Sequence, residues 1–247
     1  MTPQRILDLD LDFFLDHVAT WRSDDDPRLS DDEYHPWDEM QVREFLEKHC
    51  GLSLQRPIPG KLVKHHDEAF VWWRDLIEQG DLTPPFEIVH VDAHSDTGFN
   101  PGDRYLMTEL LHLPPEERTH PRSGWMGMNA GNYLCFAVAC RWVSKIVFVL
   151  HLEWESDFGL PHFRDKDPSS FLFQLKQCTL DSISGPINSM FGPSKFVAEP
   201  EVPFEIFFDR FNNDKPFTHG LLSQSPGFTP QSVDKLITIV MEYFSPG

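Results

Sequence analysis

Two short strings place ionisable side chains at alternating positions directly after an apolar run. One holds Asp8, Asp10 and Asp12, and the other, residues 90–96, alternates imidazole with carboxylate. Alternate residues of a strand face the same side, so each string directs its polar groups at one region. Unpaired carboxylates at such short range repel, and their burial is costly. Two such strings in one chain therefore predict a site for one or two divalent metal ions.

The donor types indicate which metals fit. Carboxylate oxygens with a minority of imidazole nitrogens suit Mn(II) or Mg(II) better than an ion selected by thiolates. A two-metal site also needs a carboxylate that bridges both ions. One more imidazole would complete the set, and a helix start near residue 65 offers either His65 or His66. The sequence thus predicts a centre of aspartates and histidines built from three segments.

Strands alternate with helices along the whole chain. Apolar runs predict strands over residues 5–11, 86–91, 145–150 and 204–208. Periodicity and end signals predict helices over residues 38–48, 63–79, 105–113 and 132–142, and a last helix with Thr229 as N-cap that extends to Phe244. This alternation predicts an α/β fold, with residues 1–247 forming one three-layer αβα domain around a mainly parallel sheet. Both acidic strings lie at carboxyl ends of strands, where such sheets bind ligands.

Composition excludes several classes of partner. A net charge of −18 argues against nucleic acid and favours metal ions and a cationic substrate. No apolar run is long enough for a membrane span, and no signal peptide is apparent. Cys50, Cys135, Cys140 and Cys178 lack the spacing of a zinc ribbon or disulfide framework. We therefore expect a cytoplasmic protein with four reduced, mostly buried thiols.

The acidic strings resemble those of a known superfamily. Residues 90–96 resemble the Asp-Ala-His-x-Asp signature of the ureohydrolases, which include arginase and agmatinase, and residues 9–12 resemble their Asp-x-Asp signature. The string that ends in Phe13 and Phe14 is more similar to the UPF0489 family, whose members beside ribosomal-peptide modification enzymes act as peptide arginases. The resemblance implies an arginase- or deacetylase-like fold. Because the Asp-x-Asp strand comes second in arginases and first here, it also implies a circular permutation.

The resemblance also implies roles for individual residues. The implied ligands of two Mn(II) ions are Asp10, Asp12, His66, Asp92, His94 and Asp96. Asp10 and Asp92 would bridge the ions and, with His94, form the catalytic set. Asp8 would then lie behind the ligands, or replace one of them after a shift of register. Likewise, His65 would be the ligand in place of His66 if its imidazole, and not that of His66, faced the metal ions.

A mechanism follows from this centre. Two divalent ions that share a water leave it as hydroxide near neutral pH, and the hydroxide attacks a guanidinium carbon. The resemblance implies that arginine side chains in a ribosomally made precursor peptide become ornithine as urea is released. Glu153 is a candidate to hold the guanidinium, and Asn132, first a helix N-cap, is a candidate substrate contact. His120, His151 and His162 are candidates for a proton shuttle.

Two other functions stay open. The same fold hosts hydrolysis of small guanidino compounds and of amide bonds, and a non-catalytic acidic module could bind basic peptides. The acidic stretch over residues 16–38 is either a solvated loop or a lid that faces the substrate. Residues 222–230 either line the pocket or form an ordinary loop before a helix. The identity of the peptide and the oligomeric state do not follow from the sequence.

Overall fold

A computed structural model describes residues 3–23, 25–179, 197–208 and 210–246. Its main sheet has eight strands in the order β10-β2-β9-β1-β3-β4-β8-β5, and every neighbouring pair is parallel except β5 with β8. The strands are β1 (Arg5–Asp10), β2 (Ile58–Val63), β3 (Phe86–Asp92), β4 (Val143–Leu150), β5 (Leu172–Phe173), β8 (Val202–Phe207), β9 (His219–Ser223) and β10 (Phe244–Pro246). A separate antiparallel pair comprises β6 (Lys176–Gln177) and β7 (Val197–Ala198). The predicted α/β class with a mainly parallel sheet is confirmed.

Helices cover both faces of this sheet. The α-helices are α1 (Glu39–Glu44), α2 (Glu68–Gln79), α3 (Pro101–Thr108), α4 (Tyr133–Ala139) and α7 (Lys235–Met241). A π-helix (Phe45–His49) continues α1, and 3-10 turns span Leu11–Phe14, Leu110–His112, Pro115–Glu117, Ala130–Asn132, Leu160–His162, Arg164–Lys166, Pro168–Ser170, Pro226–Phe228 and Gln231–Asp234. None of the described helices is long and apolar enough to cross a membrane.

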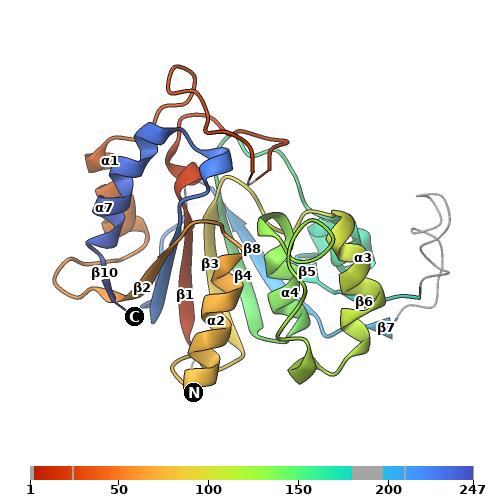
Figure 1. Cartoon of the computed structure of the whole chain (residues 1–247). Helices are drawn as coiled ribbons and strands as arrows, with labels where there is room; N and C mark the ends of the chain where they lie inside the picture. The colour runs from red at the N-terminus through yellow and green to blue at the C-terminus, as the bar shows by residue number, and fades with distance from the viewer. Residues whose placement is uncertain (1–2, 24, 180–196, 209, 247) are drawn as a thin grey trace.

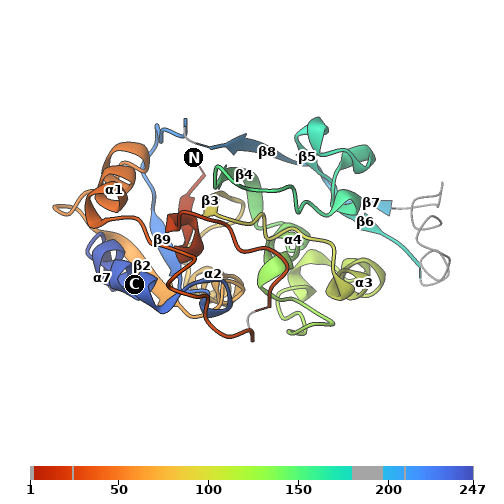
Figure 2. The same ribbon diagram turned by 90° about the horizontal axis from the view of Figure 1, so that it is seen from above.

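Alternation along the central strands fills two separate hydrophobic cores. Ile6 and Ile88 face one core, which includes apolar side chains of α2, α3 and α4. Leu7 and Val89 face the other core, which includes side chains of α1 and α7. Figure 1 shows α2 and α4 in front of the strands, with α1 and α7 grouped beside β10, and Figure 2 shows the same arrangement from above. The fold is consistent with three αβα layers.

Two predicted helix boundaries are wrong. The segment over residues 63–79 is helical only from Glu68, because residues 58–63 form β2, whose Pro59 and Gly60 obscure a strand pattern. Gly60 is needed there, since a Cβ atom would lie 2.6 Å from the ring of Phe244. The helix predicted over residues 105–113 starts earlier, at Pro101, where Asn100 forms a capping box, and ends at Thr108.

The last helix also differs from its prediction. Thr229 is buried and donates its hydroxyl to the carbonyls of Gln224 and Ser225, so it holds a turn and does not cap α7. Helix α7 begins at Lys235 and follows a 3-10 turn, and Phe244 belongs to β10. The apolar spacing that suggested one continuous helix therefore spans three short elements.

Candidate metal centre

The carboxyl ends of four adjacent strands, β2, β9, β1 and β3, meet at one edge of the sheet. Strand β1 ends at Asp10, β3 ends at Asp92, and the chain reaches His66 shortly after β2. The parallel register places Leu9 of β1 opposite Val91 of β3, so the two terminal aspartates are neighbours. In Figure 1 these strand ends point up toward the red and orange loop that follows β1. The topology thus brings the predicted segments together where α/β sheets bind ligands.

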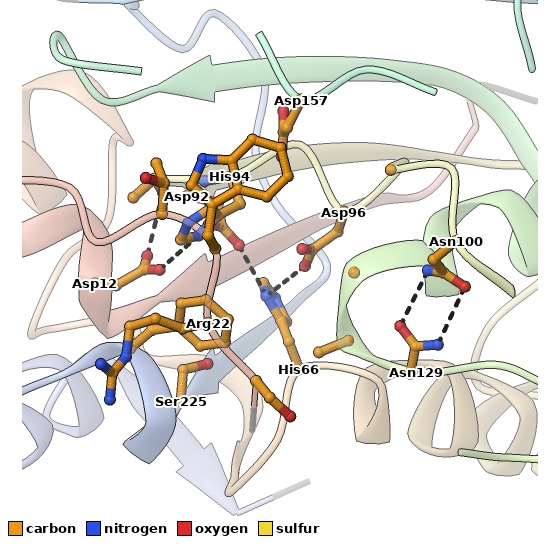
Figure 3. A pocket seen from close by; sticks show the side chains of 18 of the residues that line it. Asp12, Arg22, His66, Asp92, His94, Asp96, Asn100, Asn129, Asp157 and Ser225 are labelled. Carbon is orange, nitrogen blue, oxygen red and sulfur yellow. Dashed lines mark hydrogen bonds and ion pairs between the residues drawn. The ribbon is translucent and has the colours of Figure 1, made fainter. Parts of the chain in front are cut away.

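His66 marks the first cation position. Its Nδ1 atom lies 3.2 Å from Asp10 Oδ2, 2.9 Å from Asp92 Oδ2 and 3.0 Å from Asp96 Oδ2. Figure 3 shows the imidazole between Asp92 and Asp96. All four residues are buried, yet neither His66 Nδ1 nor Asp96 Oδ2 has a hydrogen bond of acceptable geometry. His90 Nε2 lies 3.4 Å from Asp92 Oδ2 and is likewise buried without a hydrogen bond of acceptable geometry. His66, His90, Asp92 and Asp96 thus form a group that could hold a metal ion, and Asp10 Oδ2 lies beside it.

His94 marks a second cation position beside the first. Its Nδ1 atom lies 2.9 Å from Asp12 Oδ2 and 3.6 Å from Asp92 Oδ1, and its Nε2 atom lies 3.0 Å from the Ala19 carbonyl. Because that carbonyl can only accept, Nε2 carries a proton, so Nδ1 is the nitrogen that a metal ion held by the aspartates could bind once its own proton is displaced. Asp92 therefore offers Oδ2 to the first position and Oδ1 to the second, as a bridging ligand would.

Asp10 and Asp96 contribute in different ways. Asp10 Oδ1 accepts the Asp12 amide at 2.9 Å, which caps the turn that carries Asp12, and Asp10 Oδ2 accepts the hydroxyl of Ser225. Asp10 thus presents one oxygen to His66, and its bridging role stays a prediction. Asp96 has a left-handed backbone with a φ of 49°. Such strained residues concentrate at functional sites, where the surrounding structure holds them in place.

Electrostatics at the centre favour a cation. Burial and the nearby charges of Asp10 and Asp92 raise the pKa of Asp12 well above its usual range. Burial and the charge of Asp92 likewise raise the pKa of Asp96 to about 7. Burial alone would lower the pKa of His94, but Asp12 and Asp92 outweigh it and raise that pKa. Metal ions would satisfy the same negative field that otherwise binds protons.

Asp8 lies behind the first position and does not line the pocket. Its carboxylate is fully buried, with Oδ1 3.2 Å from His66 Nε2 and Oδ2 3.0 Å from His90 Nδ1. The Tyr133 hydroxyl donates to Asp8 Oδ2 at 2.5 Å. Burial alone would raise the Asp8 pKa, but His66 and His90 hold it well below its usual range. Asp8 can therefore accept a hydrogen bond from His66 Nε2, which leaves Nδ1 facing Asp10, Asp92 and Asp96.

The centre forms part of a pocket of about 490 Å³. The described residues of its walls include Val18, residues 20–23 and Asp25, residues 98–100, parts of 124–131, residues 155–157, and Ser225 with Phe228. Trp21 and Trp125 line the same pocket and are 99% and 70% exposed. Part of the acidic segment after β1 therefore lines the pocket, and its role as a lid that faces the substrate stays a prediction. The segment before α7 also contributes to it.

Several other candidates lie outside this pocket lining. Asn132 is buried and accepts the Asn129 amide, so it closes the turn before α4 and makes no side-chain cap to that helix. Glu153 is exposed and pairs with His17 at 3.0 Å. His120 is exposed, and His151 Nε2 lies 3.0 Å from the Leu15 carbonyl.

The sequence left open whether His65 or His66 is the ligand. His66 lines the pocket and His65 does not. Three contributors escaped sequence reasoning, namely His90, Tyr133 and the hydroxyl of Ser225. His90 did carry a local signal, because it stands two residues before Asp92 in the second string, whereas Tyr133 and Ser225 meet their aspartates only through tertiary structure.

Comparison of the chain with protein-family models, curated proteins and solved structures finds no match.

Proposed function

We propose that this chain is a metal-dependent hydrolase that converts arginine side chains of a peptide to ornithine and releases urea. One observation carries the proposal: two adjacent cation positions share Asp92 and open onto a pocket. Asp10, Asp92 and Asp96 with His66 would hold one Mn(II) ion, and Asp12, Asp92 and His94 the other. When bound, the two ions would supply a hydroxide nucleophile near neutral pH.

The chain offers a carboxylate to hold the guanidinium group. Asp157 lines the pocket, and its Oδ2 atom accepts the backbone amide of Ser95 at 2.9 Å. Its Oδ1 atom accepts the indole N–H of Trp154 at 2.9 Å, so both donors fix the carboxylate. Ser95 stands between the ligands His94 and Asp96, which places Asp157 beside the centre (Figure 3). A fixed carboxylate at this place suits a cationic, fork-shaped donor group.

Features of the pocket lining support a peptide over a free amino acid. Trp21 and Trp125 expose large apolar rings there, which can pack against residues on either side of an arginine. Asp25 and Glu155 also line the pocket and add negative charge. The net charge of −18 favours association with a basic chain.

Mass spectrometry and metal analysis test the proposal together. Protein loaded with Mn(II) is incubated with an arginine-rich peptide and, separately, with free arginine. We expect about two equivalents of Mn(II), ornithine in the peptide and little urea from free arginine. Urea from free arginine with the peptide unchanged would indicate a small-molecule hydrolase. A manganese-loaded protein that binds the peptide and releases no urea would indicate a non-catalytic acidic module.

A further inference from the structure

A second group of metal-binding side chains lies apart from the metal centre. Asp103 of α3, Cys135 of α4 and His162 of the Leu160–His162 turn meet in the interior, with exposed fractions of 0%, 0% and 1%. We call these three residues the wall cluster, because α3 directly follows Phe99 and Asn100 of the pocket wall. None of the three lines the pocket itself.

The donor atoms of the wall cluster converge on one another. All three lie within 4.8 Å of each other, and His162 Nε2 is 3.0 Å from Asp103 Oδ1. Yet neither of these two atoms has a hydrogen bond of acceptable geometry. Asp103 Oδ2 is already engaged, since it accepts the Asn100 amide at 2.6 Å in the capping box of α3. The helix cap therefore explains one oxygen of Asp103 and leaves the other directed into the cluster.

Charge in the wall cluster also favours a cation. Burial alone would lower the pKa of His162, but Cys135 and Asp103 outweigh it and raise that pKa to about 10. Burial raises the pKa of the Cys135 thiol, and the neighbouring His162 partly opposes this effect. The cluster thus retains protons where a metal ion could replace them.

We propose that Asp103, Cys135 and His162 bind one zinc-type divalent ion. The thiolate, imidazole and carboxylate form a donor set typical of Zn(II), whereas the metal centre holds no sulfur and suits Mn(II). Binding would release the thiol proton and the imidazolium proton, and the three side chains would supply one sulfur, one nitrogen and one oxygen. The ion would tie α3, α4 and the 160–162 turn together behind the pocket wall. This inference does not depend on the proposed hydrolase activity.

Cobalt substitution tests the site without an activity assay. Metal-free full-length protein is titrated with Co(II), and thiolate-to-cobalt charge-transfer absorption is recorded in the near ultraviolet. We expect this band in the wild-type protein, its loss in Cys135→Ser and its retention in Cys140→Ser. Cys140 is a matched control, because it is buried at the end of the same helix and its thiol donates to the Arg118 carbonyl. Co(II) in the metal centre cannot give the band, since its ligands include no cysteine.

Zinc content provides the second measurement. Wild-type protein should retain one equivalent of zinc after manganese loading, Asp92→Ala should keep it, and His162→Gln should lose it. Absence of the cobalt band in the wild-type protein would overturn the proposal, even if Cys135→Ser does not fold. A band that persists in Cys135→Ser, or zinc that disappears with Asp92→Ala, would overturn it as well.

Discussion

The metal centre and the wall cluster combine similar side chains with different surroundings. The centre stands at the ends of parallel strands and opens onto the pocket, whereas the wall cluster lies between helices and is enclosed. Carboxylates outnumber imidazoles in the centre, while the wall cluster has one carboxylate, one imidazole and one thiol. Access to the pocket allows chemistry on a substrate, and enclosure restricts an ion to a structural role.

The metal centre and the wall cluster also differ in how far protons alone can balance their charges. The three residues of the wall cluster reach neutrality with protons alone, as a thiol beside a carboxylate–imidazolium pair. In the centre, five aspartates (Asp8, Asp10, Asp12, Asp92 and Asp96) face three histidines (His66, His90 and His94), so if all the carboxylates are ionised even three imidazolium groups leave excess negative charge. Buried charge that is not neutralised is strongly destabilising. The centre thus depends on cations more than the wall cluster does.

The largest expected effect comes from Asp92→Ala. Because Asp92 faces both cation positions, its loss should remove both Mn(II) ions and reduce urea release to background. Zinc in the wall cluster should stay, since Asp92 is not part of it. Metal analysis and a urea assay on the same preparation check both statements. A variant that keeps a tenth of wild-type turnover would show that Asp92 does not bridge.

Removing the charge of Asp8 behind the metal centre should weaken Mn(II) binding without abolishing it. Asp8→Asn keeps the shape of a side chain that contacts His66, His90 and Tyr133 but removes its charge and one of its two hydrogen-bond acceptor oxygens. We expect Mn(II) affinity to fall about 10–100-fold, the usual range for residues that orient a ligand. Calorimetric titration of the metal-free protein measures this change. Unaltered affinity would mean that packing alone orients His66.

Asp157, which lies in the segment between the pocket and the wall cluster, provides a third test. Asp157→Asn should raise the KM for the peptide about tenfold, because one charged hydrogen bond to the guanidinium becomes neutral. The kcat and the content of both metals should change much less. Glu153→Gln is the matched control, since that exposed carboxylate pairs with His17 and lies outside the pocket lining. Equal KM values for the two variants would remove Asp157 from substrate binding.

Local sequence patterns account for the strands and site residues that were predicted correctly. Apolar runs identified β1 and β3, and alternation identified Asp10 and Asp92, which end these strands, and Asp12, which lies in the turn directly after β1. Strand β2 was missed because Pro59 and Gly60 disrupt its pattern, although it delivers His66 to the centre. Contacts that depend on tertiary structure leave no local signal.

The contacts of Tyr133, of Ser225 and within the wall cluster depend on tertiary structure in this way. The sequence predicted buried, reduced cysteines, and all four are buried and free. It could not place Cys135 beside Asp103 and His162, because their separation in the chain exceeds any helical or strand repeat.

A pH dependence should also separate the metal-free and manganese-loaded proteins. The pKa of Asp96 is raised from 3.8 to about 7, so between these values the folded metal-free protein holds a proton that the unfolded chain has lost. The stability of the metal-free protein should therefore fall as pH rises through this window. Manganese requires the carboxylate, so the stabilisation that it adds should grow over the same window, by about 1.4 kcal/mol per pH unit for each proton displaced. Thermal unfolding with and without Mn(II), measured at several pH values across the window, should show two curves that diverge. A stabilisation by Mn(II) that stays constant across it would mean that Asp96 is not a ligand whose proton the metal displaces.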